Sequence, residues 1–336
     1  MKPVQIGSRK VGDGHPAYII AEIGINHGGD CALAREMIQA AWETGVDAVK
    51  IQTFITRDFL HPSHPSYRHD IEAEISHARE QELWDFARQK QINLFSTPEE
   101  FKSLAYIQQQ NPALIKIAAM DFNYRELVQA AAALQKPIIL SSGMSTLEET
   151  LRTVRWVKET GNEQSIVLHC VSCYPALPAD CNLRAIDTLK RALKCPVGFS
   201  DHTAGIHIPL AAVALGANVI EKHFTLDKKM IGPDHRCSAD PAEMREFIHA
   251  VRDLESAMGD GCKQPAASEA APRRFKRRGV YAAADLRAGE TLAREKVAFM
   301  APSVDRGALE DWPRMEGARL KRNIAAMSAI KLDDIE

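Results

Sequence analysis

The sequence predicts an α/β fold, a (β/α)8 barrel of the TIM type, followed by a small β-rich domain. Three observations lead to this prediction. Short apolar runs alternate with amphipathic stretches of helical period, which is typical of a parallel sheet with crossover helices. Eight such runs can be counted, and together with the stretches between them they occupy about 260 residues, the usual size of a closed β/α barrel.

The apolar runs define the expected strands, and capping patterns define several of the helices between them. Asp30 is expected to cap a helix that ends at Trp42, and Ser145 with Glu148 has the pattern of a capping box. A last helix from about Pro241 to Met258 would complete the barrel. The expected strands are Tyr18–Glu22, Ala48–Thr53, Asn93–Thr97, Leu114–Ala118, Ile138–Ser141, Ile166–His169, Val197–Ser200 and Asn218–His223.

The composition changes after the barrel. Residues 1–260 form the predicted barrel, and residues 261–272 are rich in Gly, Pro, Ala, Ser and Gln without periodicity, which indicates a linker. Residues 273–336 would form the second domain. Its segments GVYAAADL, TLAREKVAFMAP and ARLKRNIAA are short and are interrupted by RAGE and Pro302, as in a small β-rich module.

Charge and composition exclude several classes of partner. The formal net charge of -2 gives no overall attraction for nucleic acid or anionic lipid, so any bound anion must meet locally placed cations. The basic run at 273–278 is interpreted as a solvated end of the linker. The N-terminal residues lack the apolar stretch of a signal peptide, and no run approaches the ~20 apolar residues of a membrane span, so we expect a cytoplasmic protein. Seven cysteines without repeated CxxC spacing predict reduced, mostly buried thiols.

Polar residues collect at the carboxyl ends of the predicted strands. These ends form the open rim of a β/α barrel, where its active sites lie. The strand-end residues are Glu22, Lys50, Gln52, Thr97, Lys116, Ser141, Ser142, His169, Ser200, Asp201, His202, Glu221 and His223.

His202 and His223 end consecutive strands, which would lie about 4.8 Å apart. Two imidazoles there could converge on one divalent ion, and a site that adds water oxygens suits manganese, magnesium or iron as well as zinc. Asp201, Glu221 and Asp234 could support such ligands. The alternative is that each histidine is an ordinary core or rim residue.

Lys50 and Lys116 lie inside apolar strands, where an ammonium group needs a negative partner. One interpretation is an internal salt bridge to a barrel carboxylate. The other is a bound phosphate or carboxylate, with hydroxyl groups facing the same rim. Glu22, next to apolar residues, is expected to have a raised pKa and to carry a proton near neutral pH.

Nine motifs occur in order along the chain: AEIGINH, VKIQTF, FSTP, LIKIA, PIILSSGM, HCVSCYP, GFSDHT, VIEKHFT and GPDH. Together they resemble the N-acylneuraminate (sialic acid) synthase family, including legionaminate and pseudaminate synthases. The C-terminal segments RRGVYAAADLRAGETL and NIAAMSAIKLDDIE are similar to the antifreeze-like, or SAF, domain that follows the barrel in that family.

The resemblance implies condensation of phosphoenolpyruvate with an N-acetylmannosamine-type amino sugar, with a divalent metal such as Mn²⁺ or Mg²⁺ held by His202 and His223. It also implies a domain-swapped homodimer, in which the small domain of one chain covers the barrel mouth of the other. Glu22 would serve in proton transfer. Phosphoenolpyruvate would be held by Lys50, Thr97, Lys116, Ser141 and Ser200, and the sugar would face Gln52, Asp121, Tyr174 and Asp234.

Some positions depart from the family pattern. Ala119 stands where a serine commonly helps to bind phosphoenolpyruvate, and Glu99 stands where an aromatic residue is frequent. Ala325 stands where some members carry an arginine, with Arg322 close by. The segment 54–91 is also shorter than in bacterial sialic acid synthases. Glu99 and this segment leave the acceptor sugar open between N-acetylmannosamine and a diacetamido-trideoxyhexose.

Two other functions are compatible with a polar barrel rim. A Schiff-base aldolase would use a desolvated strand lysine such as Lys116 as nucleophile, but it would give the paired histidines no role. A non-catalytic sugar-binding protein could use the same frame with its small domain. Borohydride trapping with pyruvate separates the first from a synthase, and sugar binding without turnover identifies the second.

Overall fold

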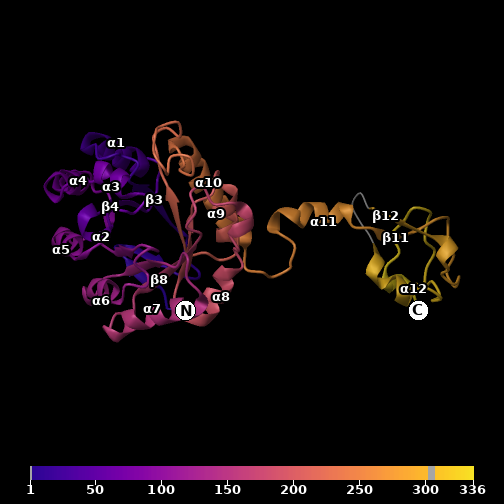
Figure 1. The fold of residues 1–336 in the computed structure, drawn as a ribbon. Helices are drawn as coiled ribbons and strands as arrows, with labels where there is room; N and C mark the ends of the chain where they lie inside the picture. Colours follow the sequence, from indigo (N-terminus) through magenta and orange to yellow (C-terminus); the bar gives the residue numbers. More distant parts are fainter. Residues whose placement is uncertain (1, 302–306) are drawn as a thin grey trace. The chain divides into compact units, whose positions relative to one another are not determined.

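The computed structural model describes residues 2–301 and 307–336 and divides into two compact units, Met1–Gly259 and Asp260–Glu336 (Figure 1). The first unit contains eight parallel strands in the order β5-β4-β3-β10-β9-β8-β7-β6, and β5 and β6 lie in contact. The predicted barrel is confirmed, and each predicted run forms a strand whose ends differ by at most two residues. The strands are β3 Tyr18–Gly24, β4 Ala48–Thr53, β5 Leu94–Pro98, β6 Ile115–Ile117, β7 Ile138–Ser141, β8 Ser165–Cys170, β9 Val197–Asp201 and β10 Val219–His223.

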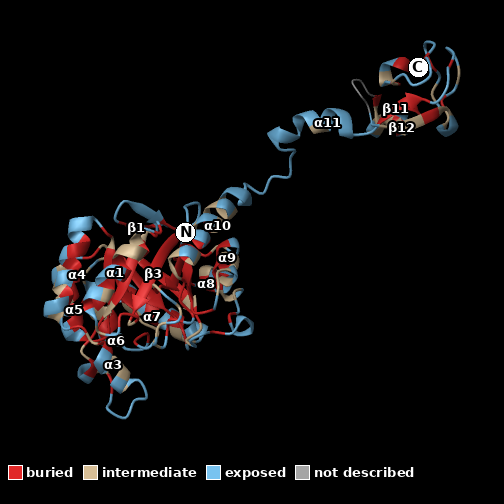
Figure 2. Ribbon diagram, turned by 90° about the horizontal axis from the view of Figure 1, so that it is seen from above, coloured by how far each residue is buried: buried red, intermediate tan, exposed pale blue. Residues whose placement is uncertain are grey.

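Helices follow the strands and surround the sheet, with their outer faces exposed and the strands buried (Figure 2). Asp30 caps α1 as predicted, because its side chain accepts hydrogen bonds from the N–H groups of residues 32 and 33. The predicted capping box was wrong by one position, since Thr146 and Glu149 form it. The helices are α1 Cys31–Trp42, α2 Thr56–Phe59, α3 Tyr67–Ala73, α4 His77–Lys90, α5 Phe101–Gln110, α6 Arg125–Ala133, α7 Leu147–Glu159, α8 Ala185–Leu193, α9 His207–Ala214 and α10 Pro241–Met258, with a 3-10 turn at Pro178–Asp180.

Both faces of the strands are buried, in two separate apolar clusters. On β3, Ile19 and Ala21 belong to the cluster between the sheet and the helices, whereas Tyr18 and Ile20 belong to the cluster inside the barrel. Successive side chains of a strand point to opposite faces, so this alternation decides which residues enter the barrel. Each fully buried isoleucine contributes about 1.5–3 kcal/mol to folding.

An antiparallel hairpin that the sequence reading did not identify precedes the barrel. It consists of β1 Val4–Ile6 and β2 Arg9–Val11. Val4, Ile6 and Val11 belong to the apolar cluster inside the barrel, together with residues from the beginnings of the strands. The hairpin therefore plugs the amino-terminal end of the barrel, and the open rim is left at the carboxyl end.

The second unit contains a three-stranded antiparallel sheet in the order β12-β11-β13 around an apolar core that includes Val280, Leu292 and Ile330. The predicted segments GVYAAADL and TLAREKVAFMAP contain strands, but the segment 318–326 forms only isolated bridges. The break expected at Pro302 lies outside the described residues. The elements are η2 Ala267–Glu269, α11 Ala270–Lys276, β11 Gly279–Ala282, η3 Arg294–Lys296, β12 Val297–Met300, β13 Gly307–Ala308, η4 Leu309–Asp311, α12 Trp312–Met315 and η5 Leu332–Asp334.

The turn η2 and the beginning of α11 lie within the segment expected to be a linker without regular structure. All seven cysteines are free thiols, and five of them are buried. Among the described residues, no helix combines the length and apolar character that crossing a membrane requires.

Candidate active site

The charged and hydroxyl side chains inside the barrel form one layer above its apolar interior. On β10, Val219 belongs to the interior apolar cluster, and Glu221 and His223, two and four positions further on, line a cavity. The same period operates on the other strands, so residues far apart in the chain meet at one height. This cavity, of about 60 Å³, is lined by Glu22, Lys50, Gln52, Thr97, Lys116, Ala118, Ala119, Ser141, Cys170, Tyr174, Ser200, His202, Glu221 and His223.

Four buried charges form the centre of this layer. Lys50 Nζ lies 2.8 Å from Glu22 Oε2 and 3.7 Å from Glu221 Oε2. Lys116 Nζ donates to both oxygens of Glu221, at 2.9 and 3.1 Å. The internal salt bridges considered from the sequence are therefore present, and the paired groups also line the cavity. We call Glu22, Lys50, Lys116 and Glu221 the charged quartet.

The pKa values of the two carboxyl groups of the charged quartet are shifted in opposite directions. Burial raises the pKa of Glu22 to about 7, with the Glu221 charge adding to the effect and the Lys50 ammonium opposing it. Burial also acts to raise the pKa of Glu221, but Lys116 and Lys50 more than offset it and hold this pKa at about 2. Near neutral pH, two ammonium groups thus face one ionised carboxylate and one carboxyl that is about half protonated.

Burial and charge also act on the two lysines. Burial acts to lower the pKa of Lys50, but Glu22 and Glu221 reverse this and raise it above its usual value. The pKa of Lys116 is lowered, chiefly by burial, although Glu221 opposes the shift. The surplus of positive charge is suited to an anionic ligand.

Hydroxyl groups surround the charged quartet. Thr97 Oγ1 accepts from Lys50 Nζ at 3.1 Å, and Ser200 Oγ donates to Glu221 Oε1 at 3.0 Å. Ser141 Oγ is buried beside the Cys170 thiol, and among the described residues no nitrogen or oxygen partner reaches it. A buried hydroxyl in this state is free to bond to a ligand in the cavity.

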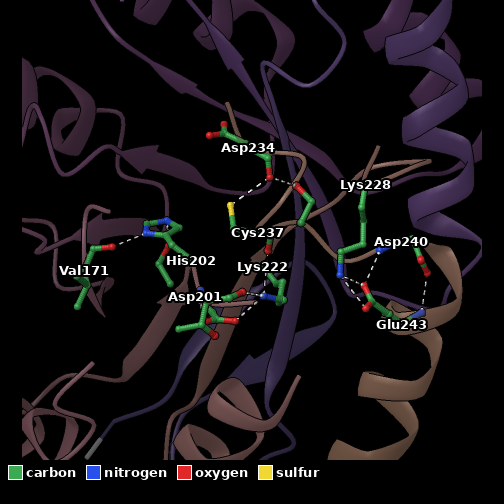
Figure 3. A network of polar contacts seen from close by, with 12 residues as sticks. Val171, Asp201, His202, Lys222, Lys228, Asp234, Cys237, Asp240 and Glu243 are labelled. Carbon is green, nitrogen blue, oxygen red and sulfur yellow. Dashed lines mark hydrogen bonds and ion pairs between the residues drawn. The ribbon is translucent and has the colours of Figure 1, made fainter. Parts of the chain in front are cut away.

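The two histidines lie next to one another, with ring centroids 5.3 Å apart, and Tyr174 packs against both rings. His202 Nδ1 donates to the carbonyl oxygen of Val171 at 2.6 Å (Figure 3), which leaves the lone pair on Nε2, 3.5 Å from Ser200 Oγ. His223 Nδ1 is buried without a hydrogen-bond partner in the described residues and lies 3.7 Å from Asp234 Oδ2. Burial lowers the pKa of both histidines, so both rings are neutral near pH 7.

Neutral, adjacent imidazoles with free nitrogen atoms fit the requirements of metal ligands. The described residues contain no group of three or more His, Cys, Asp and Glu side chains arranged to hold a metal ion. A metal ion at His202 and His223 would therefore take its other ligands from water and substrate. Asp201 does not take part, because it pairs with Lys222 at 2.6 Å and accepts from Thr203 (Figure 3).

Two of the four predicted sugar-binding residues line a second cavity, of about 270 Å³, which shares lining residues with the first. Gln52 and Tyr174 line both cavities, and so does Ala119. Asp121 is buried and hydrogen-bonded to Glu99, which lines the second cavity. Asp234 lies beside His223, outside the lining of either cavity.

Three strand-end residues predicted from the sequence lie outside the cavity lining, namely Asp201, His169 and Ser142, and two other residues contribute more to the site than the sequence pattern indicates. His169 bonds to the carbonyl oxygen of Cys181, and Ser142 bonds to that of Leu168, so neither lines the cavity. The sequence suggests Glu221 only as support for a metal, although Glu221 lies two positions before His223 and therefore on the same face of β10. It shows Glu99 only as a departure from the family pattern.

The second unit contains Ala325, at the position where some family members carry an arginine, and the neighbouring Arg322. Arg322 Nε donates to Asp334 Oδ1 at 2.6 Å within that unit, and Ala325 is exposed. The guanidinium of Arg322 is thus held by a carboxylate of its own domain.

Comparisons with known proteins agree with this geometry. The NeuB family model matches residues 37–263, and the SAF domain model matches residues 277–336. N,N'-diacetyllegionaminic acid synthase of Legionella pneumophila is 34% identical over 348 residues, which cover 98% of each chain. N-acetylneuraminate-9-phosphate synthase of Mus musculus is 35% identical over 300 residues, 84% of this chain and 83% of that protein. The solved structure of N-acetylneuraminic acid (sialic acid) synthetase from Leptospira borgpetersenii serovar Hardjo-bovis, in complex with citrate, is 35% identical with a TM-score of 0.77, and the match covers 81% of this chain and 95% of that one.

Proposed function

The chain belongs to the NeuB family, and from this premise we propose that it condenses phosphoenolpyruvate with an amino sugar of the N-acetylmannosamine type. Water is the third reactant, and the products are a nine-carbon sialic-acid-like sugar and phosphate. The alternative acceptor is a diacetamido-trideoxyhexose, which would make the enzyme a legionaminate or pseudaminate synthase.

The observation that carries this proposal is the charged quartet in its cavity. Phosphoenolpyruvate has a phosphate and a carboxylate, and Lys50 and Lys116 offer two ammonium groups that only one fully ionised carboxylate offsets. The protonated form of Glu22 would release Lys50 to bind the incoming anion. The Ser141 hydroxyl, which lacks a nitrogen or oxygen partner, would gain one.

Glu22 is suited to move a proton during the reaction. Its pKa of about 7 allows both the acid and the base to be populated at neutral pH. Gln52 Nε2 donates to Glu22 Oε1 at 3.2 Å and orients the carboxyl group toward the shared wall of the two cavities. In the proposed sequence, the methylene carbon of phosphoenolpyruvate bonds to the aldehyde carbon of the open-chain sugar. Water then adds to the resulting cationic carbon, and phosphate leaves.

His202 and His223 would hold a divalent ion, Mn²⁺ or Mg²⁺, which when bound would polarise the aldehyde oxygen of the acceptor. The roles of the chain itself are to keep both imidazoles neutral by burial and to fix the His202 tautomer through Val171. Tyr174 restrains the orientation of both rings by packing on them.

The direct test is sugar-dependent release of inorganic phosphate from phosphoenolpyruvate. We expect a chelator to abolish the release and Mn²⁺ to restore it, and we expect His202→Ala to stay inactive when Mn²⁺ is added. N-acetylmannosamine and the two diacetamido-trideoxyhexoses are assayed side by side to identify the acceptor. Activity that persists without metal, or borohydride trapping of Lys116 with pyruvate, contradicts the proposal.

We also propose that the enzyme is a homodimer in which the small domain of one chain covers the barrel mouth of the other. The proposal follows from the family resemblance. Light scattering should give twice the chain mass of 37.2 kDa, and a monomer that retains full activity contradicts it.

A further inference from the structure

The cavity of 270 Å³ beside the charged quartet has an unusual electrostatic character. Asp70 and Glu99 line it, together with the apolar side chains of Phe54, Phe59 and Met144. Among the described residues, no lysine, arginine or histidine lines it. The cavity therefore offers hydrogen-bond acceptors and apolar contacts, but no cation of its own.

Glu99 and Asp121 form a carboxyl pair at the wall of this cavity. Glu99 follows β5 directly, and its N–H donates to the carbonyl oxygen of Thr53 at 3.2 Å, which fixes it at the rim. The two side chains are 6% and 8% exposed and are hydrogen-bonded to each other. In the described part of the chain, no other group donates to Glu99 Oε2 or Asp121 Oδ2.

Two carboxyl groups in contact cannot both be ionised at low cost, so the pair holds one proton between its members. Burial and the Asp121 charge raise the pKa of Glu99 well above its usual range, and burial raises that of Asp121 to about 6. At neutral pH the pair therefore carries about one negative charge. Lys50 and Lys116 act on it from the adjoining cavity, where they are paired with Glu22 and Glu221, and no cation in the described lining of the larger cavity offsets it.

We infer that the Glu99–Asp121 pair, with Asp70, restricts the acceptor to sugars that are uncharged at the end farthest from the reacting aldehyde. Such a sugar presents hydroxyl or amide N–H groups to the carboxyl oxygens and apolar carbons to the phenylalanine and methionine side chains. A phosphate at that end would meet like charge in a desolvated cavity. The inference rests on the proposed synthase activity and separates this chain from a relative whose product carries a 9-phosphate.

The first experiment compares two acceptors that differ in charge. The kcat/KM for N-acetylmannosamine should exceed that for its 6-phosphate by on the order of 100-fold. Met144, which is 74% exposed and lines the same cavity, allows a cation to be introduced without disturbing the core. Met144→Arg should raise kcat/KM for the 6-phosphate by about tenfold, while the neutral control Met144→Gln should not.

The second experiment removes the charge of the pair. Glu99→Gln alone leaves the Asp121 charge in place and should keep the preference for N-acetylmannosamine over its 6-phosphate. Glu99→Gln combined with Asp121→Asn should reduce the ratio of the two kcat/KM values by about tenfold relative to wild type. Melting temperatures of all variants verify folding, and the KM for phosphoenolpyruvate of the two Met144 variants should change less than about twofold, since Met144 does not line the smaller cavity.

Equal use of both sugars by the wild type overturns the inference, as does a Met144→Arg variant that behaves like Met144→Gln. If no sugar supports phosphate release, the proposed function has failed. Calorimetric titration of the same two sugars in the presence of phosphoenolpyruvate then decides the inference separately. Equal affinity contradicts it, and tighter binding of the uncharged sugar supports it.

Discussion

The two ends of the barrel interior are built from the same strands and differ sharply in chemistry. At the amino end, Val219 and Ile20 pack with the N-terminal hairpin in a fully apolar cluster. Two residues further along the same strands and on the same face, Glu221 and Glu22 join Lys50 in a charged layer. The inner faces of β3 and β10 therefore carry apolar residues toward the amino end and charged residues toward the carboxyl end, only two positions apart.

The two ends should also differ in what they contribute to folding. Burial of apolar surface stabilises the fold directly. A buried ion pair gives little net stability, because desolvation of the charges offsets their attraction. Substitutions at the two ends should therefore separate stability from activity.

The largest effect is expected from Lys116→Met in the charged layer. It leaves Glu221 without its closest cation and should cost about 3–5 kcal/mol in the free energy of unfolding. Phosphate release should fall on the order of a thousandfold, because one of two anion-binding ammonium groups is lost. Denaturant unfolding and steady-state kinetics measure the two losses.

Lys116→Met combined with Glu221→Gln is the matched control. Removal of both charges should restore much of the stability, because no unpaired charge remains, while activity should stay low. If the double variant were active, the ammonium group would have no role in binding phosphoenolpyruvate.

At the apolar end, the opposite pattern is expected. Phe95 is fully buried inside the barrel, two positions before Thr97. Phe95→Ala should cost about 3–5 kcal/mol in unfolding free energy through the cavity that it creates. Molecules that remain folded should keep kcat within a few-fold of wild type. Met258→Ala, at an exposed position at the end of α10, is the control and should change stability by less than about 0.5 kcal/mol.

Glu80 on α4 is a buried carboxyl of a third kind, because it forms no ion pair with any described residue. Thr53 and Trp84 donate to it, and burial raises its pKa from 4.5 to about 7. Its contribution to stability is complete below pH 4.5 and is lost as the pH rises through 7. Glu221, with its pKa of about 2, contributes above pH 4.5 and loses its contribution as the pH falls toward 2.

Glu80→Gln tests this sign. The stability difference between wild type and variant should shift against wild type by at most about 3 kcal/mol between pH 4.5 and pH 8. Glu82→Gln, at an exposed position on the same helix, is the control for the loss of one carboxylate from α4. A constant difference across this range would mean that Glu80 is ionised throughout.

The alternation of side chains along a strand also explains which parts of the fold and the site could be predicted from the sequence. The eight strands and the inward-facing residues Glu22, Lys50 and His223 were predictable because apolar runs and alternation are local properties. The same rule, applied further, would have placed His169 and Asp201 on the outer face. It would also have placed Glu221 beside His223 in the layer.

Other features depend on contacts that no local pattern encodes. The partner of Lys116 comes from a strand 105 positions away, so its choice between a substrate and an internal carboxylate needs the closed barrel. The hairpin of β1 and β2 has three residues in each strand, too few for a period to be recognised. The Glu99–Asp121 pair joins the segments that follow β5 and β6, two strands that lie in contact but come from different parts of the chain.

The smallest effects are expected from two serines that occupy opposite ends of neighbouring strands. Ser141 ends β7 beside the Cys170 thiol and lines the cavity, while Ser165 begins β8 beside the Cys195 thiol. Ser141→Ala should raise the KM for phosphoenolpyruvate about 3- to 10-fold through one lost hydrogen bond, and should leave stability unchanged or slightly higher. Ser165→Ala should have the same small effect on stability and none on KM. If both variants bound phosphoenolpyruvate as wild type does, the hydroxyl of Ser141 would have no role in binding this ligand.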